Sequence, residues 1–254
     1  MAEPILLLDV GNTRLKWALD DEGAFLAGGG FRHGGRLDPD ALGTLIRCDA
    51  ARPVRGVVSC VANEPLCATL AGWFEQHLGL SLQRVTAAAR GWGVVNGYAQ
   101  PQRLGSDRWA AMVAARNRCA GLVCVVDAGT AITVDLLDGA GQHQGGYILS
   151  GLHMLLEGVA ENTAVRVSDL PAPLREPGRD TACGLANGAL EAACAFIESI
   201  VRHFEQQMGE AVQCLLTGGD GALLSPHLQI PHATEPALVL HGLSRMARED
   251  PATS

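Results

Sequence analysis

The chain has 254 residues, of which 48% are hydrophobic and 18% charged, and its formal net charge is −8. This composition predicts one or two globular domains with aliphatic cores and excludes an intrinsically disordered chain. The acidic balance argues against broad binding to nucleic acid, while a local basic pocket for an anionic substrate stays compatible with it.

The N-terminus and the cysteines indicate the compartment. "MAEPILLLDV" has no basic segment before its short apolar run, so we expect no signal peptide, and no stretch is expected to span a membrane. The eight cysteines form no C-x-x-C and no zinc-like spacing. They are expected to be mostly buried thiols of a cytoplasmic protein.

The first predicted element is a hairpin over residues 6–20, "LLLDVGNTRLKWALD", with 24–31 as a third strand. Its tight D-x-G-x-T turn directs backbone N–H groups outward, as a nest for phosphate oxygens requires. Asp9 could hold Mg²⁺ directly or through water. Lys16, the only lysine in the chain, would reach a phosphate from the return strand. An ordinary turn with a surface lysine is the alternative for this motif taken singly.

Next we expect two helices, over 39–47 and 64–78, and two strands, over 54–61 and 82–86. A further helix is expected over 106–118. Asp107 in its first turn is explained by the helix dipole, whereas Arg108 is not, because a cation is unfavourable there. Arg108 therefore predicts an anionic ligand.

The second half repeats the first. Residues 123–138, "VCVVDAGTAITVDLLD", form another D-x-G hairpin, with 143–150 as its third strand. Helices are expected over 152–163, 181–208, 220–228 and 236–248, and a strand over 211–219. Its paired glycines could receive an adenine or ribose, although for this motif taken singly a simple strand-to-helix turn is the better explanation. The repeat predicts two similar α/β halves, 1–117 and 118–254, with a cleft between them.

Taken in order, these motifs resemble those of type III pantothenate kinases, members of the actin/Hsp70/sugar-kinase superfold with its ribonuclease-H-like domains. "DVGNTRLK" fits D-x-G-N-T-x-x-K, "YAQPQRLGSDR" ends in G-x-D-R, and "DAGTAITVD" fits D-x-G-T-A-x-T-x-D. "GGYILSG" fits G-G-x-I-x-P-G except that Ser150 replaces proline.

The resemblance implies ATP-dependent phosphorylation of pantothenate, the first step of coenzyme A biosynthesis, by a homodimer with Mg²⁺ and K⁺ or NH₄⁺. It implies Asp107 as the base that accepts the hydroxyl proton, and Asp127 at the monovalent cation. The implied ATP-binding residues are Asp9, Val10, Gly11, Asn12, Thr13, Arg14, Leu15, Lys16 and Thr130. The implied substrate-binding residues are Tyr98, Gly105, Ser106, Asp107, Arg108 and Thr181. A helix N-cap is the alternative interpretation of Thr181, which could serve both roles.

Two other functions stay open at this point. One is a non-catalytic regulator of the same fold, and the other is a phosphohydrolase, which would have no need of a carboxylate-binding G-x-D-R. The proline-rich segment 166–180 is interpreted as a flap near the substrate.

Overall fold

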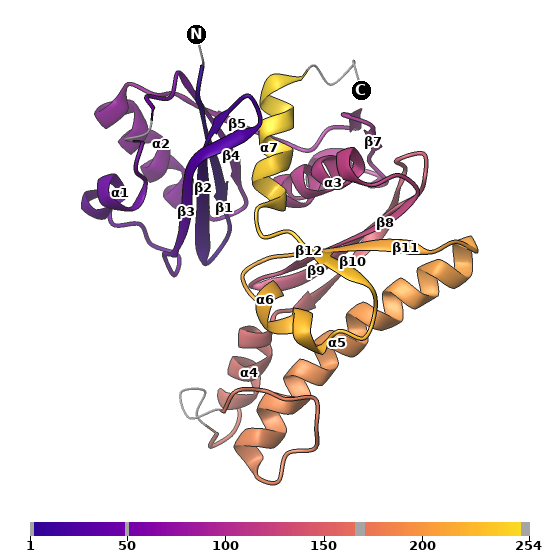
Figure 1. Cartoon of the computed structure of the whole chain (residues 1–254). Coiled ribbons are helices and arrows are strands. Elements are labelled where there is room, and N and C mark those ends of the chain that lie inside the picture. The colour runs from indigo at the N-terminus through magenta and orange to yellow at the C-terminus, as the bar shows by residue number, and fades with distance from the viewer. Residues whose placement is uncertain (1–2, 49–50, 166–170, 250–254) are drawn as a thin grey trace. The chain divides into compact units, whose positions relative to one another are not determined.

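The computed structural model describes residues 3–48, 51–165 and 171–249, and these form two compact units (Figure 1). The first unit comprises the described residues up to Arg118 together with those from Ala237 onward, and the second is Cys119–Pro236.

The first unit contains a five-stranded sheet in the order β3-β2-β1-β4-β5. The first three strands are antiparallel, whereas β4 runs parallel to β1, and β5 parallel to β4. The bounds are β1 Ile5–Val10, β2 Arg14–Asp21, β3 Ala24–Arg32, β4 Arg55–Cys60 and β5 Leu82–Arg84. A separate two-stranded ribbon, β6 (Arg90–Gly91) and β7 (Val94–Val95), was not expected from the sequence.

Helix α2 (Glu64–Leu78) shows how the sequence defines a helix in this unit. The Asn63 side chain accepts from the Leu66 N–H at its start, and Gly79 ends it in a left-handed conformation, φ 60°. Its buried residues Leu66, Leu70 and Phe74 recur every four positions and pack into the core of the sheet. The unit's other helices are α1 (Pro39–Leu45), α3 (Ser106–Arg118) and α7 (Leu238–Arg248).

The last helix, α7, belongs to the first unit, whereas the sequence placed all of 118–254 in the second half. The buried carboxylate of Asp20 accounts for this difference, because it must be paired. Ser244 donates to Asp20 Oδ1 at 3.0 Å, and Arg248 Nε donates to Oδ2 at 2.6 Å. Helix α7 also lies against α3 so closely that a Cβ at Gly242 would overlap the Ala110 backbone (Figure 1).

The second unit repeats the architecture of the first. Its sheet has the order β10-β9-β8-β11-β12, again with three antiparallel strands followed by two parallel ones. The expected duplication of a mixed α/β sheet is therefore confirmed. The bounds are β8 Leu122–Ala128, β9 Ala131–Leu137, β10 His143–Ser150, β11 Val212–Thr217 and β12 His232–Thr234.

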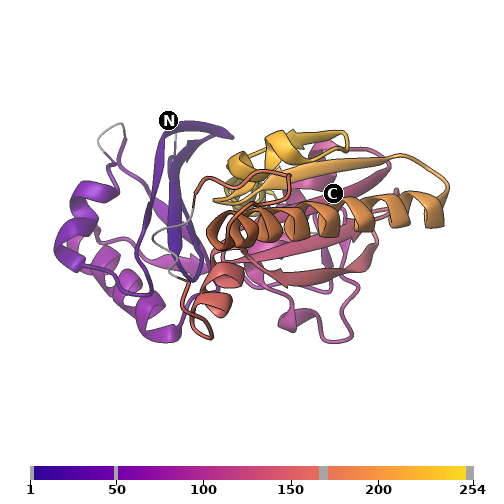
Figure 2. The same cartoon turned by 90° about the horizontal axis from the view of Figure 1, so that it is seen from below.

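The second core is covered by α5 (Thr181–Met208), which runs along the sheet in Figure 2. This helix is long and apolar enough to cross a membrane by length and composition, which corrects the expectation that no stretch would qualify. However, 56% of its apolar window is buried inside the protein, as in the core helix of a globular domain. The helices α4 (Leu152–Ala160) and α6 (Gly221–Leu224) complete the unit, and a 3₁₀ turn, Ser225–His227, follows α6.

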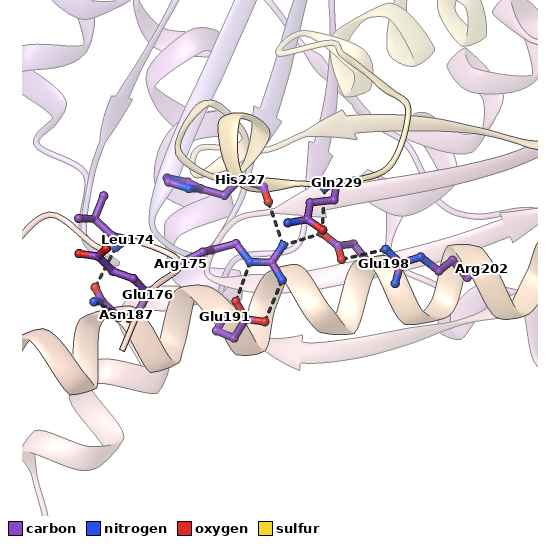
Figure 3. Close-up of polar contacts among 9 residues, drawn as sticks. All are labelled: Leu174, Arg175, Glu176, Asn187, Glu191, Glu198, Arg202, His227 and Gln229. Atoms are coloured by element: carbon purple, nitrogen blue, oxygen red, sulfur yellow. Dashed lines mark hydrogen bonds and ion pairs between the residues drawn. The ribbon is translucent and has the colours of Figure 1, made fainter. Parts of the chain in front are cut away.

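The structure adds detail to two further sequence expectations. Cys60 and Cys67 form a disulfide between the end of β4 and α2, so not all eight cysteines are thiols. Of the expected flap 166–180, residues 166–170 lie outside the described part. From Leu174 onward the segment is hydrogen-bonded to α5, because the Asn187 side chain accepts from Leu174 N and donates to Glu176 O (Figure 3).

Candidate active site

The first candidate loop joins β1 to β2. Asp9 is half-buried near the end of β1, and its register partners are Lys16 on β2 and Ser59 on β4. Gly11 N donates to Arg14 O at 3.0 Å and closes the turn. The structure thus brings Asp9 and Lys16 together on adjacent strands at one edge of the sheet.

The expected nucleotide-contacting residues of this loop divide into two kinds. Asn12 and Arg14 are exposed, and Gly11, Thr13 and Lys16 are partly exposed. The side chains of Val10 and Leu15 are fully buried in the core. Those two can therefore reach a ligand only through their backbone.

Lys16 lies beside the glycines of β3. A Cβ at Gly30, its register partner, would stand 3.3 Å from Lys16 Cγ and 3.0 Å from the Leu15 carbonyl oxygen. The bare backbone of "GGG", residues 28–30, leaves room for the lysine stem along the neighbouring strand.

The G-x-D-R motif lies at the start of α3. Ser106 Oγ is buried and hydrogen-bonds Ser59 Oγ at 2.8 Å, which joins the start of α3 to the end of β4. A Cβ at Gly105 would overlap Asp107 Oδ1, so glycine there leaves space for the carboxylate. Asp107 Oδ1 accepts from the Arg108 N–H at 2.7 Å. Because Ser59 is also the register partner of Asp9, one strand end supports both the Asp9 loop and the start of α3.

Arg108 is buried, and its Nη1 donates to the Tyr98 hydroxyl at 2.8 Å. Its guanidinium lies 5.6 Å from the centre of the Tyr98 ring. Asn96 accepts from Tyr98 N and donates to the carbonyls of Ala88 and Pro101, which fixes this part of the chain. The structure therefore brings Tyr98 and Arg108 together, as the sequence motif suggested. The hydrogen bond to the Tyr98 hydroxyl offsets part of the cost of burying the Arg108 cation at the start of a helix.

The second candidate loop joins β8 to β9 and is built on close backbone contacts. Gly129 N donates to Ala131 O at 3.0 Å, and Gly151 N donates to Thr130 O at 3.0 Å. A Cβ at Gly151 would overlap the backbone of Gly129 and Thr130, which explains the final glycine of "GGYILSG".

The paired glycines after β11 meet this same loop. Gly218 has φ +97°, and a Cβ there would overlap the Ala128 backbone, while Asp220 N donates to Ala128 O at 2.8 Å. Asp127 is half-buried, and Thr217 on β11 is its register partner. The second unit thus gathers the D-x-G-T loop and the Gly218-Gly219 turn at one edge of its sheet.

Thr181 is the first residue of α5 and is exposed. The N-cap is its neighbour Asp180, whose Oδ1 accepts from Cys183 N at 2.8 Å. This hydrogen bond lowers the pKa of Asp180. The interpretation of Thr181 as the cap was therefore wrong by one residue, and its hydroxyl is not the capping group.

Two buried thiols, Cys124 and Cys194, are poorly suited to catalysis. A hydrogen bond with Cys214, together with burial, raises the pKa of Cys124 well above its usual value. Burial raises the pKa of Cys194 to about 11. A catalytic cysteine needs a thiolate, and these environments disfavour it.

Within residues 3–48, 51–165 and 171–249, no three His, Cys, Asp or Glu side chains gather as a metal site. A cation at either loop would therefore need oxygens from a ligand or water besides the one aspartate. The hydroxyl of Thr217 is buried and has no hydrogen-bond partner among these residues. An oxygen without a partner beside Asp127 fits a hard cation, which prefers oxygen ligands.

Sequence reasoning missed two residues that support the first loop. No role was assigned to any histidine, yet His33 Nε2 lies 3.0 Å from the Gly11 carbonyl oxygen. Ser59 carried no signal either, because it lies inside an apolar strand and its partner Ser106 is far away in the sequence.

Two sheets of the same topology, each with a D-x-G loop at the turn of its first hairpin, define an ATPase fold of the actin/Hsp70 class. Solved structures agree at the level of the fold. A conserved protein of Campylobacter jejuni, described as a Baf family transcriptional activator, is 19% identical, with a TM-score of 0.59 over 97% of this chain and 99% of that one. The ethanolamine utilization protein EutJ of Carboxydothermus hydrogenoformans is 13% identical, with a TM-score of 0.53 over 94% and 88%.

Sequence comparison gives the family. A family model described as type III pantothenate kinase matches residues 5–203. The type III pantothenate kinase of Laribacter hongkongensis (strain HLHK9) is 39% identical over 96% of this chain and 98% of its own length. The chain therefore belongs to the type III pantothenate kinase family, a family of phosphotransferases, and the resemblance of its motifs is confirmed.

Proposed function

We propose that this chain transfers the γ-phosphoryl group of ATP to the primary hydroxyl of pantothenate, with Asp107 as the base. The observation that carries the assignment is the link through Ser59. This residue joins the start of α3, which holds Asp107, to the strand beside Asp9 and Lys16. The proposed base and the proposed phosphate loop therefore share one rigid support.

Phosphoryl transfer depends more on positioning and charge neutralisation than on covalent help. In the proposed reaction the backbone of residues 9–16 binds the phosphates, and Lys16 neutralises developing charge from β2. Thr130 donates to a phosphate from the second loop. Asp107 accepts the hydroxyl proton, a contribution of about 10²–10⁴-fold for a positioned base.

Substrate recognition is assigned to the region around Arg108. Its guanidinium pairs with the carboxylate of pantothenate, and Tyr98 holds it in place through the 2.8 Å hydrogen bond. Gly105 and Ser106 offer backbone donors beside it, and Thr181 is assigned a further substrate contact.

Asp9 and Asp127 are the proposed cation residues. Asp9 would hold Mg²⁺, directly or through water, and the ion would neutralise charge on the phosphates. Asp127, with the hydroxyl of Thr217 nearby in register, would hold K⁺ or NH₄⁺. The oxygen donors present at both loops suit these hard ions.

We further propose a homodimer in the cytoplasm. Strand β10 is at the edge of its sheet and exposes Tyr147 and Ile148, whose relative exposures are 46% and 63%. Helix α4, which packs on β10, exposes Met154 and Val159. An apolar edge strand is a surface that proteins normally cover. The mass of one chain is 26.6 kDa. Light scattering should give twice that mass, and a monomer at micromolar concentration would refute the dimer.

The deciding experiment measures ADP release in Mg²⁺ and K⁺, with and without pantothenate. The proposal predicts release that depends on pantothenate. Release independent of it would indicate a phosphohydrolase, and no release would indicate a regulator.

Lys16→Ala tests the phosphate loop within this assay. It should lower kcat/KM at least about 100-fold, the order of losing an electrostatic contact to the transition state, with an unchanged circular dichroism spectrum. Lys16→Arg is the matched control for charge and should recover part of the loss, because it restores a cation of a different shape. Full activity of Lys16→Ala would refute this role.

A further inference from the structure

His33 follows β3 directly and contacts the first loop at two carbonyl groups. Its Nε2 lies 3.0 Å from Gly11 O, and its backbone N–H donates to Thr13 O at 2.9 Å. Gly34 N also donates to Thr13 O, at 3.3 Å. We propose that His33 is a positioning residue that fixes the phosphate loop in its ligand-binding conformation.

The two ring nitrogens define the protonation state that this role requires. Gly35 N lies 3.0 Å from Nδ1, and a backbone N–H can only donate, so Nδ1 accepts and carries no proton. Gly11 O can only accept, so Nε2 carries the proton and donates. His33 therefore acts as the neutral Nε2–H tautomer, with both ring nitrogens satisfied.

This hydrogen bond determines the direction of an N–H group in the loop. The chain has no cis peptide bond among its described residues, so the carbonyl of Gly11 and the N–H of Asn12 point in opposite directions from one planar group. Holding the Gly11 carbonyl toward His33 directs the Asn12 N–H to the other side of the loop. A nest for an anion requires N–H groups directed in this way.

The bonds to Thr13 add a second restraint of the same kind. Its carbonyl accepts from both His33 and Gly34, so two carbonyls of the turn are held on the side of β3. The turn itself is closed by the hydrogen bond from Gly11 N–H to Arg14 O. His33 thus restrains the loop before nucleotide arrives, and preorganisation of this kind increases affinity.

The inference rests on the proposed nucleotide role of residues 9–16, and three variants separate its parts. His33→Gln retains an amide that can donate to Gly11 O. His33→Asn retains only an oxygen near the position of Nδ1, within reach of Gly35 N. His33→Ala removes both contacts. His77→Gln on α2 is the control, because that exposed ring hydrogen-bonds the carbonyl and stacks on the ring of Trp73 in its own helix.

Each variant is measured by steady-state kinetics and by calorimetry with a non-hydrolysable ATP analogue and Mg²⁺. We expect His33→Ala and His33→Asn to raise KM for ATP and Kd for the analogue about 3–10-fold, the worth of one hydrogen bond. KM for pantothenate should stay within about twofold. His33→Gln and His77→Gln should bind nearly as the wild type does.

Two results would overturn the proposal. One is a nucleotide affinity that equals that of the wild type in every His33 variant. The other is a His33→Gln variant that binds nucleotide as weakly as His33→Ala does. If His33→Ala does not fold, the comparison of His33→Gln with His33→Asn still tests the proposal. Calorimetry also separates this proposal from the proposed reaction: a wild type that binds the analogue but does not phosphorylate pantothenate would refute the reaction and leave the His33 comparison decisive.

Discussion

Replacing Arg175 by methionine tests how the segment before α5 is held. In Figure 3 its guanidinium lies between α5 and the turn that contains His227. Nε and Nη2 bind the two oxygens of Glu191 at 2.6 and 2.8 Å, and Nη1 binds Glu198 Oε1 at 2.7 Å and His227 O at 2.9 Å. Methionine retains much of the apolar stem and removes every one of these donors.

The expected loss follows from the exposure of the two carboxylates. The Glu191 side chain is 53% exposed, so solvent screens its ion pair and the pair contributes little to stability. The Glu198 side chain is 5% exposed, and an uncompensated buried charge costs about 3–5 kcal/mol. Glu198 keeps Gln229 N at 2.9 Å and Arg202 at 3.3 Å, which reduces that cost. We expect a total of about 2–4 kcal/mol, or a fall in Tm of about 5–15 °C.

Differential scanning calorimetry is the assay, with Arg202→Met as the control, because Arg202 is largely exposed and should cost under about 1 kcal/mol. Adding Glu198→Gln to Arg175→Met should recover at least about 1 kcal/mol, since the buried charge is gone. The hydrogen bond with Arg175 lowers the pKa of Glu191, so the contribution of this pair is fully present above the ordinary pKa of a glutamate and is lost as the pH falls through the lowered pKa. An Arg175→Met variant within about 0.5 kcal/mol of the wild type, which is no more than one surface ion pair contributes, would refute the reasoning.

Three more predictions concern the loops and the disulfide. Asp107→Asn should retain ATP and pantothenate binding by calorimetry but lower kcat about 10²–10⁴-fold, and near-normal turnover would remove Asp107 as the base. Gly218→Ala should destabilise the second unit by about 2–4 kcal/mol in urea unfolding, because the new Cβ meets the Ala128 backbone at a positive φ, and an unchanged midpoint would contradict that contact. Cys67→Ser should lower stability by about 2 kcal/mol under oxidising conditions and leave it unchanged in reductant, whereas equal loss in both would mean that the bond to Cys60 contributes nothing.

The sequence predicted most of the elements that position the site. The helices over 64–78, 106–118 and 181–208 have the expected bounds, because each has a clear apolar period and a defined start or end. The duplicated hairpins were predicted from the repeated D-x-G motif, and both sheets show them. The residues of G-x-D-R and Tyr98 were grouped through the family resemblance, and the 2.8 Å contact between Tyr98 and Arg108 agrees.

The periodic pattern of apolar residues could not predict contacts between residues that are distant in the sequence. The membership of α7 in the first unit depends on Asp20, more than 200 positions earlier, whose burial the strand pattern did not reveal. His33 is an isolated histidine after a glycine-rich strand, and only the pairing of β2 with β3 brings it to Gly11. The very short strands β6, β7 and β12 have too few residues for any periodic signal.

A crystal structure with a non-hydrolysable ATP analogue, Mg²⁺ and pantothenate tests the central claim most directly. We expect the phosphates to contact the backbone of residues 11–13 and the Thr130 hydroxyl, with the pantothenate hydroxyl within hydrogen-bonding distance of Asp107. Electron density for the nucleotide away from both loops would contradict the account.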